Sequence, residues 1–392
     1  MEANVLPLTS LMLNAKLVES LSQVAPPVLT AYLDTTPTDP RNLRQPPRYF
    51  IWLKSQCQAL EANMQKPERK AFHEQVQRVE EYLTQSPPAT RGLVIFANPK
   101  IWQVIALRVD TIDELFWGLP SVSQLLWLVE EHRHCGVVLA NRSVVRLFHY
   151  WMAELVEEHR ETPKIDTSEW KRKDLKPPSQ PGVEMLRGSH RDAFERRMEA
   201  QYARFYSAES AHVRAWAERE NLNPIFLFGP PKVVEMLHSD LPKAIQSRTV
   251  MVQKDLEHLP IAEFQARVES ELRQWELGYE RSLVDRLLDG SGSKRAVLGV
   301  DDTLVGLQEG LARDTVVVRG IQEQVQQCTN CGWTDRAPDK TCPACGGTRL
   351  LTALRSVLPR LTKRYKVPLE IIADGNGEKL RNAGGGIGAL LK

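Results

Sequence analysis

The sequence lacks the features that mark membrane-spanning and secreted proteins. No uncharged apolar run approaches the roughly 18 residues that a membrane helix needs. The first residues, MEANVLPLTSLMLNAKLVESL, have acidic side chains near both ends and no basic region before an apolar stretch. We therefore expect a short amphipathic helix here rather than a signal peptide. These absences predict a cytoplasmic protein with no membrane partner.

Cysteine is scarce, and its placement argues against a secreted disulfide framework. The chain has six cysteines in 392 residues, and four of them lie between positions 328 and 345. Disulfide-rich secreted domains instead spread many cysteines over a short chain. Cys57 and Cys135 stand alone in apolar surroundings, and we expect both to be buried small hydrophobic residues.

An excess of charge of one sign is also absent from the chain as a whole. Lys and Arg number 51 against 49 Asp and Glu, which gives a formal net charge of +2. A protein that coats DNA is usually more basic than this. The excess lies in residues 294–392, which hold 15 basic and 10 acidic side chains. This asymmetry permits a polyanionic partner without requiring one.

Apolar segments alternate with amphipathic ones, which predicts an α/β fold of mixed α+β type. We expect long helices at about 191–221 and 261–288, and a linker or loop tip at 289–294, DGSGSK. The length suits roughly two to four domains. Composition changes suggest three: an N-terminal α/β domain (1–134), a central domain with long helices (135–290) and a C-terminal α/β domain (291–392).

The four clustered cysteines form the strongest motif in the chain. Cys328 and Cys331 make one Cys-x2-Cys pair, and Cys342 and Cys345 make a second pair ten residues later. Two such pairs place four thiolates around one tetrahedral Zn²⁺. A redox dithiol is the alternative. Four thiolates would leave no open position for water, so we expect a structural zinc ribbon inserted at 326–349 in the C-terminal domain.

The C-terminal domain resembles a known family. Its sequence VLGVDDTLVGLQEGLARDTVVV, the cysteine insert and the closing VPLEIIADGNGEKLRNAGGGIGALL resemble the third domain of archaeal and eukaryotic class-1 peptide release factors and of Pelota. The chain is similar to a bacterial member of this group, which includes a ribosome hibernation factor. The resemblance implies a three-domain release-factor/Pelota-like architecture. We expect the glycines of 384–388 to allow close packing of the last segment; no Lys-Ser/Thr follows them, as a phosphate-binding P-loop requires.

The resemblance directs attention to Gly188-Ser189-His190. Active release factors carry a Gly-Gly-Gln tip before a long helix in domain two, and this trio occupies about that position. The sequence contains no Gly-Gly-Gln. We therefore expect a factor that binds the ribosomal A site during hibernation or the handling of stalled ribosomes. We expect a binding factor in preference to an enzyme. In the alternative, His190 acts as a catalytic base in a peptidyl-tRNA hydrolase or tRNA nuclease. The simplest structural interpretation makes Ser189 the N-cap of the helix.

Basic residues near this trio are candidates for contact with ribosomal RNA. The candidates for contact with 23S rRNA (the 23S end of the protein) are Lys171, Arg172, Lys173, Arg187, Gly188, Ser189, His190 and Arg191. The candidates for contact with 16S rRNA (the 16S end) are Arg41 and Arg44. Contacts of Lys and Arg with phosphates are indifferent to sequence and sensitive to salt. The alternative is a solvated charged loop, because acidic residues are interspersed with the basic ones in 161–184.

A later helix carries a run of basic residues without an intervening acid: Arg355, Arg360, Lys363, Arg364 and Lys366. This face could bind rRNA or a protein, or it could simply be solvated. In the family, the third domain meets a translational GTPase, and for a bacterial member the resemblance implies elongation factor Tu or a related GTPase. We expect a monomer. A third possibility is an RNA-binding or adaptor protein that uses its zinc module to contact a partner.

Overall fold

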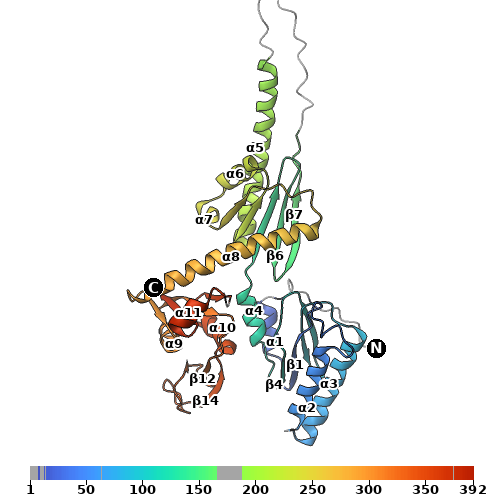
Figure 1. Ribbon diagram of the computed structural model, residues 1–392, viewed down its shortest axis with the longest axis vertical. Coiled ribbons are helices and arrows are strands. Elements are labelled where there is room, and N and C mark those ends of the chain that lie inside the picture. The colour runs from blue at the N-terminus through green and yellow to red at the C-terminus, as the bar shows by residue number, and fades with distance from the viewer. Residues whose placement is uncertain (1–7, 9–12, 14, 63, 166–187, 374) are drawn as a thin grey trace, which may run out of the picture. The chain divides into compact units, whose positions relative to one another are not determined.

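The computed structural model describes residues 8, 13, 15–62, 64–165, 188–373 and 375–392 (Figure 1). By their internal contacts these residues form two compact units. Unit 1 combines Met1–His132 with Ser270–Lys392, and unit 2 is Arg133–Glu269. The predicted mixed α/β architecture is confirmed. The division into three sequential domains stays a prediction.

The described residues form helices and strands throughout both units. The helices are α1 (Ala15–Ser22), α2 (Arg48–Glu61), α3 (Lys66–Gln85), α4 (Ser123–Glu131), α5 (Gly188–Arg219), α6 (Pro231–Asp240), α7 (Lys243–Gln246), α8 (Ile261–Ser291), α9 (Val300–Gln308), α10 (Leu354–Tyr365) and α11 (Glu378–Gly384). The strands are β1 (Val28–Asp34), β2 (Gly92–Ala97), β3 (Trp102–Leu107), β4 (Glu114–Gly118), β5 (Cys135–Ala140), β6 (Val145–Trp151), β7 (Glu154–Glu161), β8 (Ile225–Phe228), β9 (Thr249–Val252), β10 (Ala296–Leu298), β11 (Ala312–Val318), β12 (Gln324–Cys328), β13 (Thr334–Asp335), β14 (Arg349–Ala353), β15 (Leu369–Ile372) and β16 (Ile387–Leu391).

The N-terminal part of unit 1 is an antiparallel sheet covered by helices. Its strand order is β3-β2-β1-β4, with Thr30 of β1 opposite Phe96 of β2 and Phe116 of β4. On α3 the buried residues Phe72, Val76, Val79 and Leu83 recur every three or four positions, which gives the helix one apolar face. That face packs with α2 on the sheet residues in a common core.

The C-terminal part of unit 1 has its own mixed sheet. Its order is β10-β16-β11-β15, in which β11 and β15 are parallel and the last strand, β16, lies antiparallel between β10 and β11. A Cβ atom added to Gly388 would lie 2.7 Å from the carbonyl oxygen of Val297, and one at Gly384 would lie 2.9 Å from the amide nitrogen of Gly299. The expectation that these glycines permit close packing is confirmed.

Helix α4 packs against the C-terminal part of unit 1. Its Trp127 is fully buried in the same core as Leu304 of α9 and Val316 of β11, and the helix contacts α10 and β15. The carboxylate of Glu131, at the end of α4, lies 2.6 Å from Nε of Arg319. Helix α4 of the first segment therefore contributes to the core of segment 270–392, although unit 2 separates the two segments in the sequence.

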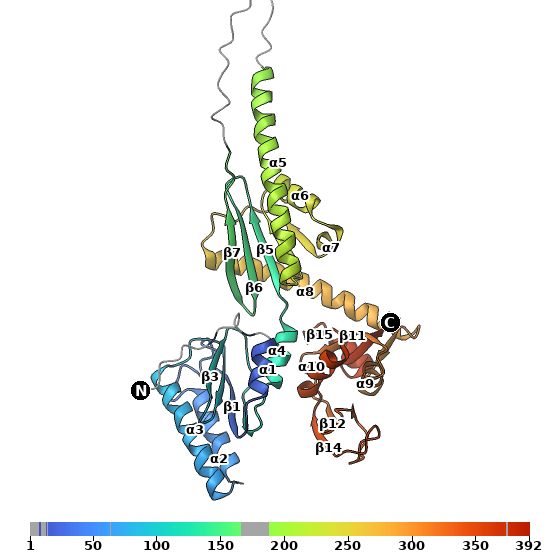
Figure 2. The ribbon, with the colours of Figure 1, turned by 180° about the vertical axis from the view of Figure 1, so that it is seen from behind.

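Unit 2 is a five-stranded sheet with apolar residues on both faces. The order is β7-β6-β5-β8-β9; β5, β8 and β9 are parallel, and β6 and β7 continue antiparallel from β5. Figure 2 shows α5 along one face, and the start of α8, residues 261–269, crosses the other face. Alternate residues of β8 serve the two faces: Ile225 packs with Trp216 of α5, and Phe228 packs with Phe264 of α8.

The long helices are where the sequence places them, but their ends differ. The helix predicted from about 191 begins at Gly188, and the helix predicted to end near 288 continues to Ser291. The linker expected at 289–294 therefore starts inside α8, so that part of the prediction is wrong. None of the described helices combines the length and the apolar character that crossing a bilayer requires.

We expect Phe264→Ala to destabilise unit 2 by about 3–5 kcal/mol, because Phe264 is 2% exposed and the cavity left between Phe148 and Phe228 cannot fill. Hydrogen exchange of the β5 and β8 amides under increasing urea measures this change. Ile261→Ala on the same helix is the matched control, because Ile261 is 53% exposed. Equal effects of the two substitutions would contradict the packing described for α8.

Candidate functional site

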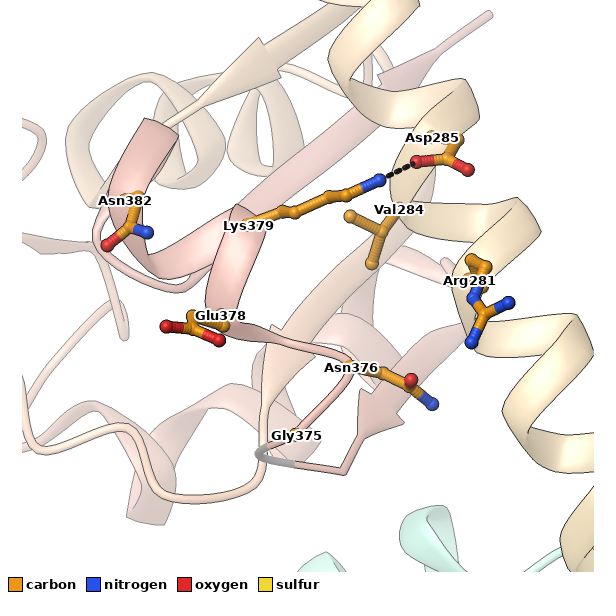
Figure 3. A pocket seen from close by; sticks show the side chains of 8 residues that line it. All are labelled: Arg281, Val284, Asp285, Gly375, Asn376, Glu378, Lys379 and Asn382. Atoms are coloured by element: carbon orange, nitrogen blue, oxygen red, sulfur yellow. Dashed lines mark hydrogen bonds and ion pairs between the residues drawn. The ribbon is translucent and has the colours of Figure 1, made fainter.

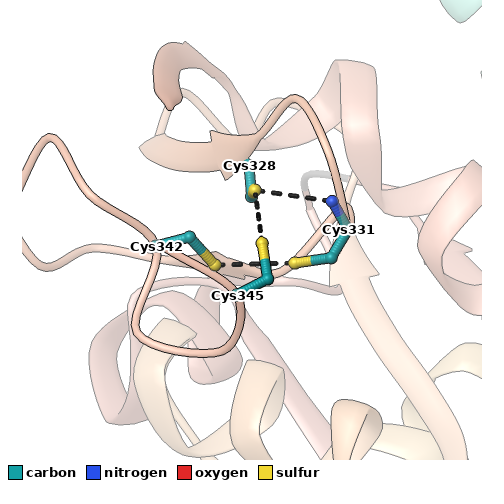
Figure 4. Close-up of side chains that lie close together, drawn as sticks. All are labelled: Cys328, Cys331, Cys342 and Cys345. Atoms are coloured by element: carbon teal, nitrogen blue, oxygen red, sulfur yellow. Dashed lines mark hydrogen bonds between the residues drawn. The ribbon is translucent and has the colours of Figure 1, made fainter. Parts of the chain in front are cut away.

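The four predicted metal ligands come together in the C-terminal part of unit 1. Figure 4 shows Cys328 at the end of β12, Cys331 in the turn that follows, and Cys342 and Cys345 on a second turn facing the first. The Sγ atoms of Cys328 and Cys345 are 3.5 Å apart, as are those of Cys331 and Cys342. All four lie within 4.8 Å of one another, and the cysteines are not disulfide-bonded.

Each cysteine pair lies on a tight turn with the same hydrogen-bonding pattern. The amide of Gly332 donates to the carbonyl of Cys328 at 3.0 Å, and the amide of Gly346 donates to that of Cys342 at 2.8 Å. Both glycines have positive φ, +74° and +72°, a conformation that costs glycine little. The spacing Cys-x2-Cys-Gly thus produces two matching turns that aim their thiols at a common point.

Backbone amides stabilise the thiolate forms of Cys328 and Cys345. The amides of Cys331 and Asn330 donate to Sγ of Cys328 at 3.4 Å, and they lower the pKa of this thiol to about 6. The amide of Gly347 likewise lowers the pKa of Cys345. Several thiolates this close together repel one another unless a cation lies between them. Zn–S bonds of about 2.3 Å place tetrahedral sulfur ligands roughly 3.8 Å apart, so the four side chains fit such an ion.

The turns are fastened to the neighbouring helices by polar contacts. Gln308 of α9 exchanges two hydrogen bonds of 2.8 Å with the backbone of Thr334 in β13. From α10, Nη1 of Arg364 donates to the carbonyl of Cys331 at 2.5 Å. The buried guanidinium of Arg349 pairs with Asp335. These polar contacts, together with Val325 of β12 in the neighbouring hydrophobic core, attach the three-stranded sheet β13-β12-β14 to the rest of unit 1.

The basic face predicted on α10 is smaller than expected. Arg360, Lys363, Arg364 and Lys366 are exposed. Arg355 is half-buried, with its guanidinium 5.0 Å from the ring centroid of Trp127, and burial lowers its pKa. The inclusion of Arg355 in the exposed face is therefore wrong. Arg355 lies in the first turn of α10, where the helix packs on α4 and the guanidinium covers Trp127.

The two arginines proposed for the 16S end have different surroundings. Arg41 pairs with Asp39 at 2.8 Å, and this contact lowers the pKa of Asp39 to about 2. Arg44 is exposed and makes no ion pair with the residues that the structure describes. The neighbouring Arg48 is held by Asp34 at 2.9 Å and Asp113 at 2.5 Å. Of the basic side chains in this loop, Arg44 is the one whose charge is not already paired.

The trio Gly188-Ser189-His190 forms the first residues of α5, followed by Arg191. The described part of the helix includes Ser189, and its role as the N-cap stays a prediction. The catalytic role of His190 stays a prediction. Lys171, Arg172, Lys173 and Arg187 lie outside the described residues.

A second cluster of side chains that could hold a metal ion was not predicted from the sequence. His159 of β7 lies next to Glu209 and His212 of α5, with the three ligand atoms within 4.8 Å of one another. The only local signal is the Glu-x-x-His spacing of 209–212, because His159 is distant in the sequence.

A polar cavity of about 300 Å³ lies between α8 and the segment 375–382 (Figure 3). Nζ of Lys379 lies 2.9 Å from Oδ1 of Asp285 across this cavity. A further bond joins the side-chain amide of Asn376 to Glu280 of α8 at 2.7 Å. No residue selected from the sequence lines this cavity.

Comparison with known families identifies the central part of the chain. Residues 120–271, which include the whole of unit 2, match the bacterial archaeo-eukaryotic release factor family 10. For this segment, the resemblance to a bacterial relative of the archaeal and eukaryotic release factors is confirmed. No curated protein sequence matches the chain.

Solved structures of this group also match. The C-terminal domain of a peptide chain release factor from Methanosarcina mazei is 22% identical over 33% of this chain and 92% of its own, with a TM-score of 0.26. Dom34 from S. cerevisiae is 10% identical over 80% and 77% of the two chains, with a TM-score of 0.37. A ribosome-bound archaeal Pelota is 13% identical over 76% and 77%, with a TM-score of 0.40.

Proposed function

We propose that this chain is a ribosome-binding factor of release-factor/Pelota type that occupies the A site without cleaving peptidyl-tRNA. One observation carries the proposal: the segment that matches the release-factor family has Gly188-Ser189-His190 at the start of α5, and the chain contains no Gly-Gly-Gln. Placing a nucleophile at an ester is a geometric task, and a different side chain in a different backbone does not reproduce it. Such a factor would act in the cytoplasm as a monomer, in hibernation or in the handling of stalled ribosomes.

The 23S end of the proposed interface is the segment that joins β7 to α5. It contains Lys171, Arg172, Lys173 and Arg187, and Arg191 follows in the first turn of α5. Cationic side chains neutralise rRNA phosphates and release counterions, which supports binding that falls steeply with salt. Gly188, Ser189 and His190 would contribute a small surface suited to close approach to RNA.

The 16S end of the proposed interface rests mainly on Arg44. Its charge is exposed, whereas that of Arg41 is satisfied by Asp39 and that of Arg48 by two carboxylates. A guanidinium already paired with a carboxylate gains less from an rRNA phosphate. The exposed residues Arg360 and Lys363 of α10, with Lys366 at its C-terminal end, are the proposed contact for a translational GTPase such as elongation factor Tu.

The cysteine cluster is proposed to hold a structural Zn²⁺ through Cys328, Cys331, Cys342 and Cys345. The four thiols fill a tetrahedral shell, so no position remains for a catalytic water. The metal would supply the folding free energy that the small sheet β13-β12-β14 cannot obtain from a core of its own.

Replacing Cys328 and Cys345 together by serine should remove about one equivalent of zinc per chain and unfold the insert, because two ligands cannot hold a structural ion. Metal analysis gives the zinc content, and hydrogen exchange should show the β12 and β14 amides exchanging like an unfolded segment while β11 stays protected. Cys57→Ala is the control and should keep the metal. Unchanged zinc content in the double variant would rule out this site.

The protein should co-sediment with 70S ribosomes at low salt and dissociate as salt rises. Changing Lys171, Arg172 and Lys173 to glutamate should reduce the slope of log affinity against log salt by roughly 3, because each lysine or arginine contact with a phosphate contributes about one. Glutamate at Lys66, Lys70 and Lys243, which are exposed elsewhere, is a control of equal charge. Wild-type protein that stays at the top of the gradient would refute ribosome binding.

The protein should release no peptide from stalled 70S complexes carrying peptidyl-tRNA, and it should leave the tRNA intact. Gel analysis of labelled peptidyl-tRNA, with an active release factor as positive control, measures both reactions. Release or cleavage that His190→Ala abolishes would establish the enzyme alternative instead. Binding without turnover would support the proposed function, and binding to free RNA as tight as to ribosomes would favour an adaptor.

A further inference from the structure

A second candidate metal site lies in unit 2 between the edge strand β7 and helix α5. His159 comes from β7, and Glu209 and His212 come from α5. Nε2 of His159 is 3.0 Å from Oε2 of Glu209, and Nδ1 of His212 is 3.2 Å from Oε1 of the same carboxylate. The rings of the two histidines approach edge to face with centroids 5.3 Å apart.

A β-bulge aims His159 at the helix. Consecutive residues of a regular strand point to opposite faces of its sheet. In β7, however, both Glu158 and His159 reach α5: Glu158 accepts a 2.8 Å hydrogen bond from Nε1 of Trp216, and His159 meets Glu209. The pairing of β6 with β7 shifts at this point, because Phe148 pairs with Glu157 and Leu147 pairs with His159. The extra residue re-aims the strand, a use of bulges found beside functional sites.

The carboxylate of Glu209 is buried. Its side chain is 3% exposed, whereas the side chains of His159 and His212 are 32% and 61% exposed. A buried carboxylate needs a compensating positive charge or several hydrogen bonds. Both nearest partners are imidazoles, which donate one N–H each when neutral and can instead turn a nitrogen lone pair toward a cation.

Two imidazoles and one carboxylate are a donor set typical of divalent transition metals. Zn²⁺ and Fe²⁺ are both held by such sets, with further positions left for water. Bonds of about 2.0–2.2 Å to nitrogen and oxygen place neighbouring ligand atoms roughly 3.0–3.5 Å apart, which matches the two separations. The i,i+3 spacing of Glu209 and His212 sets both on one face of α5.

We infer that His159, Glu209 and His212 bind a divalent transition-metal ion of the Zn²⁺ class. The site is separate from the cysteine cluster and has harder donors: nitrogen and oxygen in place of sulfur. Its partly exposed histidines leave the remaining coordination positions open to water. The bound ion fastens the edge strand β7 to α5, the two elements between which the basic segment 171–187 runs in the sequence.

The test is the metal content of the full-length holoprotein, dialysed with a slight excess of Zn²⁺ and then freed of unbound ion. Wild-type protein should hold about one equivalent more than Glu209→Gln or His212→Ala, and His212→Ala should weaken Zn²⁺ binding at this site at least tenfold. His212 is exposed, so its replacement leaves the fold intact even if the buried Glu209→Gln variant proves unstable. His258→Ala, an exposed histidine of the same unit, is the control and should keep the ion.

Substitution with Co²⁺ separates this site from the cysteine cluster without altering the cysteines. Thiolate ligands give intense charge-transfer absorption in the near ultraviolet, whereas nitrogen and oxygen ligands give only weak visible bands. The difference spectrum between wild type and His212→Ala should therefore contain visible bands without a thiolate band. Equal metal content in wild type and both triad variants, with a featureless difference spectrum, would overturn the proposal and leave a hydrogen-bonded trio.

Discussion

The burial of Trp127 is the constraint on which the organisation of this chain depends. Its indole lies among the side chains of α9, α10 and the C-terminal sheet, and Arg355 covers the ring. This packing places α4, at the end of the first segment of the chain, in the core of the last segment. Unit 2 is consequently an insertion, which the chain enters after His132 and leaves within α8. Helix α8 contributes Phe264 to one unit and Leu287 to the other, so both cores share a single helix.

The two side-chain clusters offer different sets of donor atoms to a cation. The cysteines come from two neighbouring turns with the same backbone pattern, and they would supply a closed shell of four soft ligands. The triad joins a strand to a helix and includes one buried carboxylate between two partly exposed imidazoles. The first suits an ion that substitutes for a missing core. The second suits an ion that connects two elements which already fold, and it leaves ligand positions open to solvent.

The proposed binding to the ribosome depends on the basic side chains that are exposed. Phosphate contacts give affinity without sequence readout, and the electrostatics of this nearly neutral chain are local rather than global. Contacts within the protein decide which basic side chains remain free to bind phosphate. Arg41 pairs with Asp39, Arg355 lies over the ring of Trp127, and Arg364 donates a hydrogen bond to the carbonyl of Cys331. A basic residue in the sequence is therefore a candidate contact only after its intramolecular partners are known.

The sequence by itself determined the features that depend on local spacing. The cysteine pairs, the long helices α5 and α8 and the C-terminal strands with their close-packed glycines all follow from periodicity, chirality and short-range geometry. Tertiary structure decided what depends on distant partners. It half-buried Arg355 over Trp127 and placed Trp127, from the first segment of the chain, in the core of the last segment. It also brought His159 to Glu209 through a bulge that shifts a strand by one residue. The neighbouring element decides which face of a strand is buried and which partner an ionic side chain finds. That element is distant in the sequence, so a local stretch of residues does not reveal it.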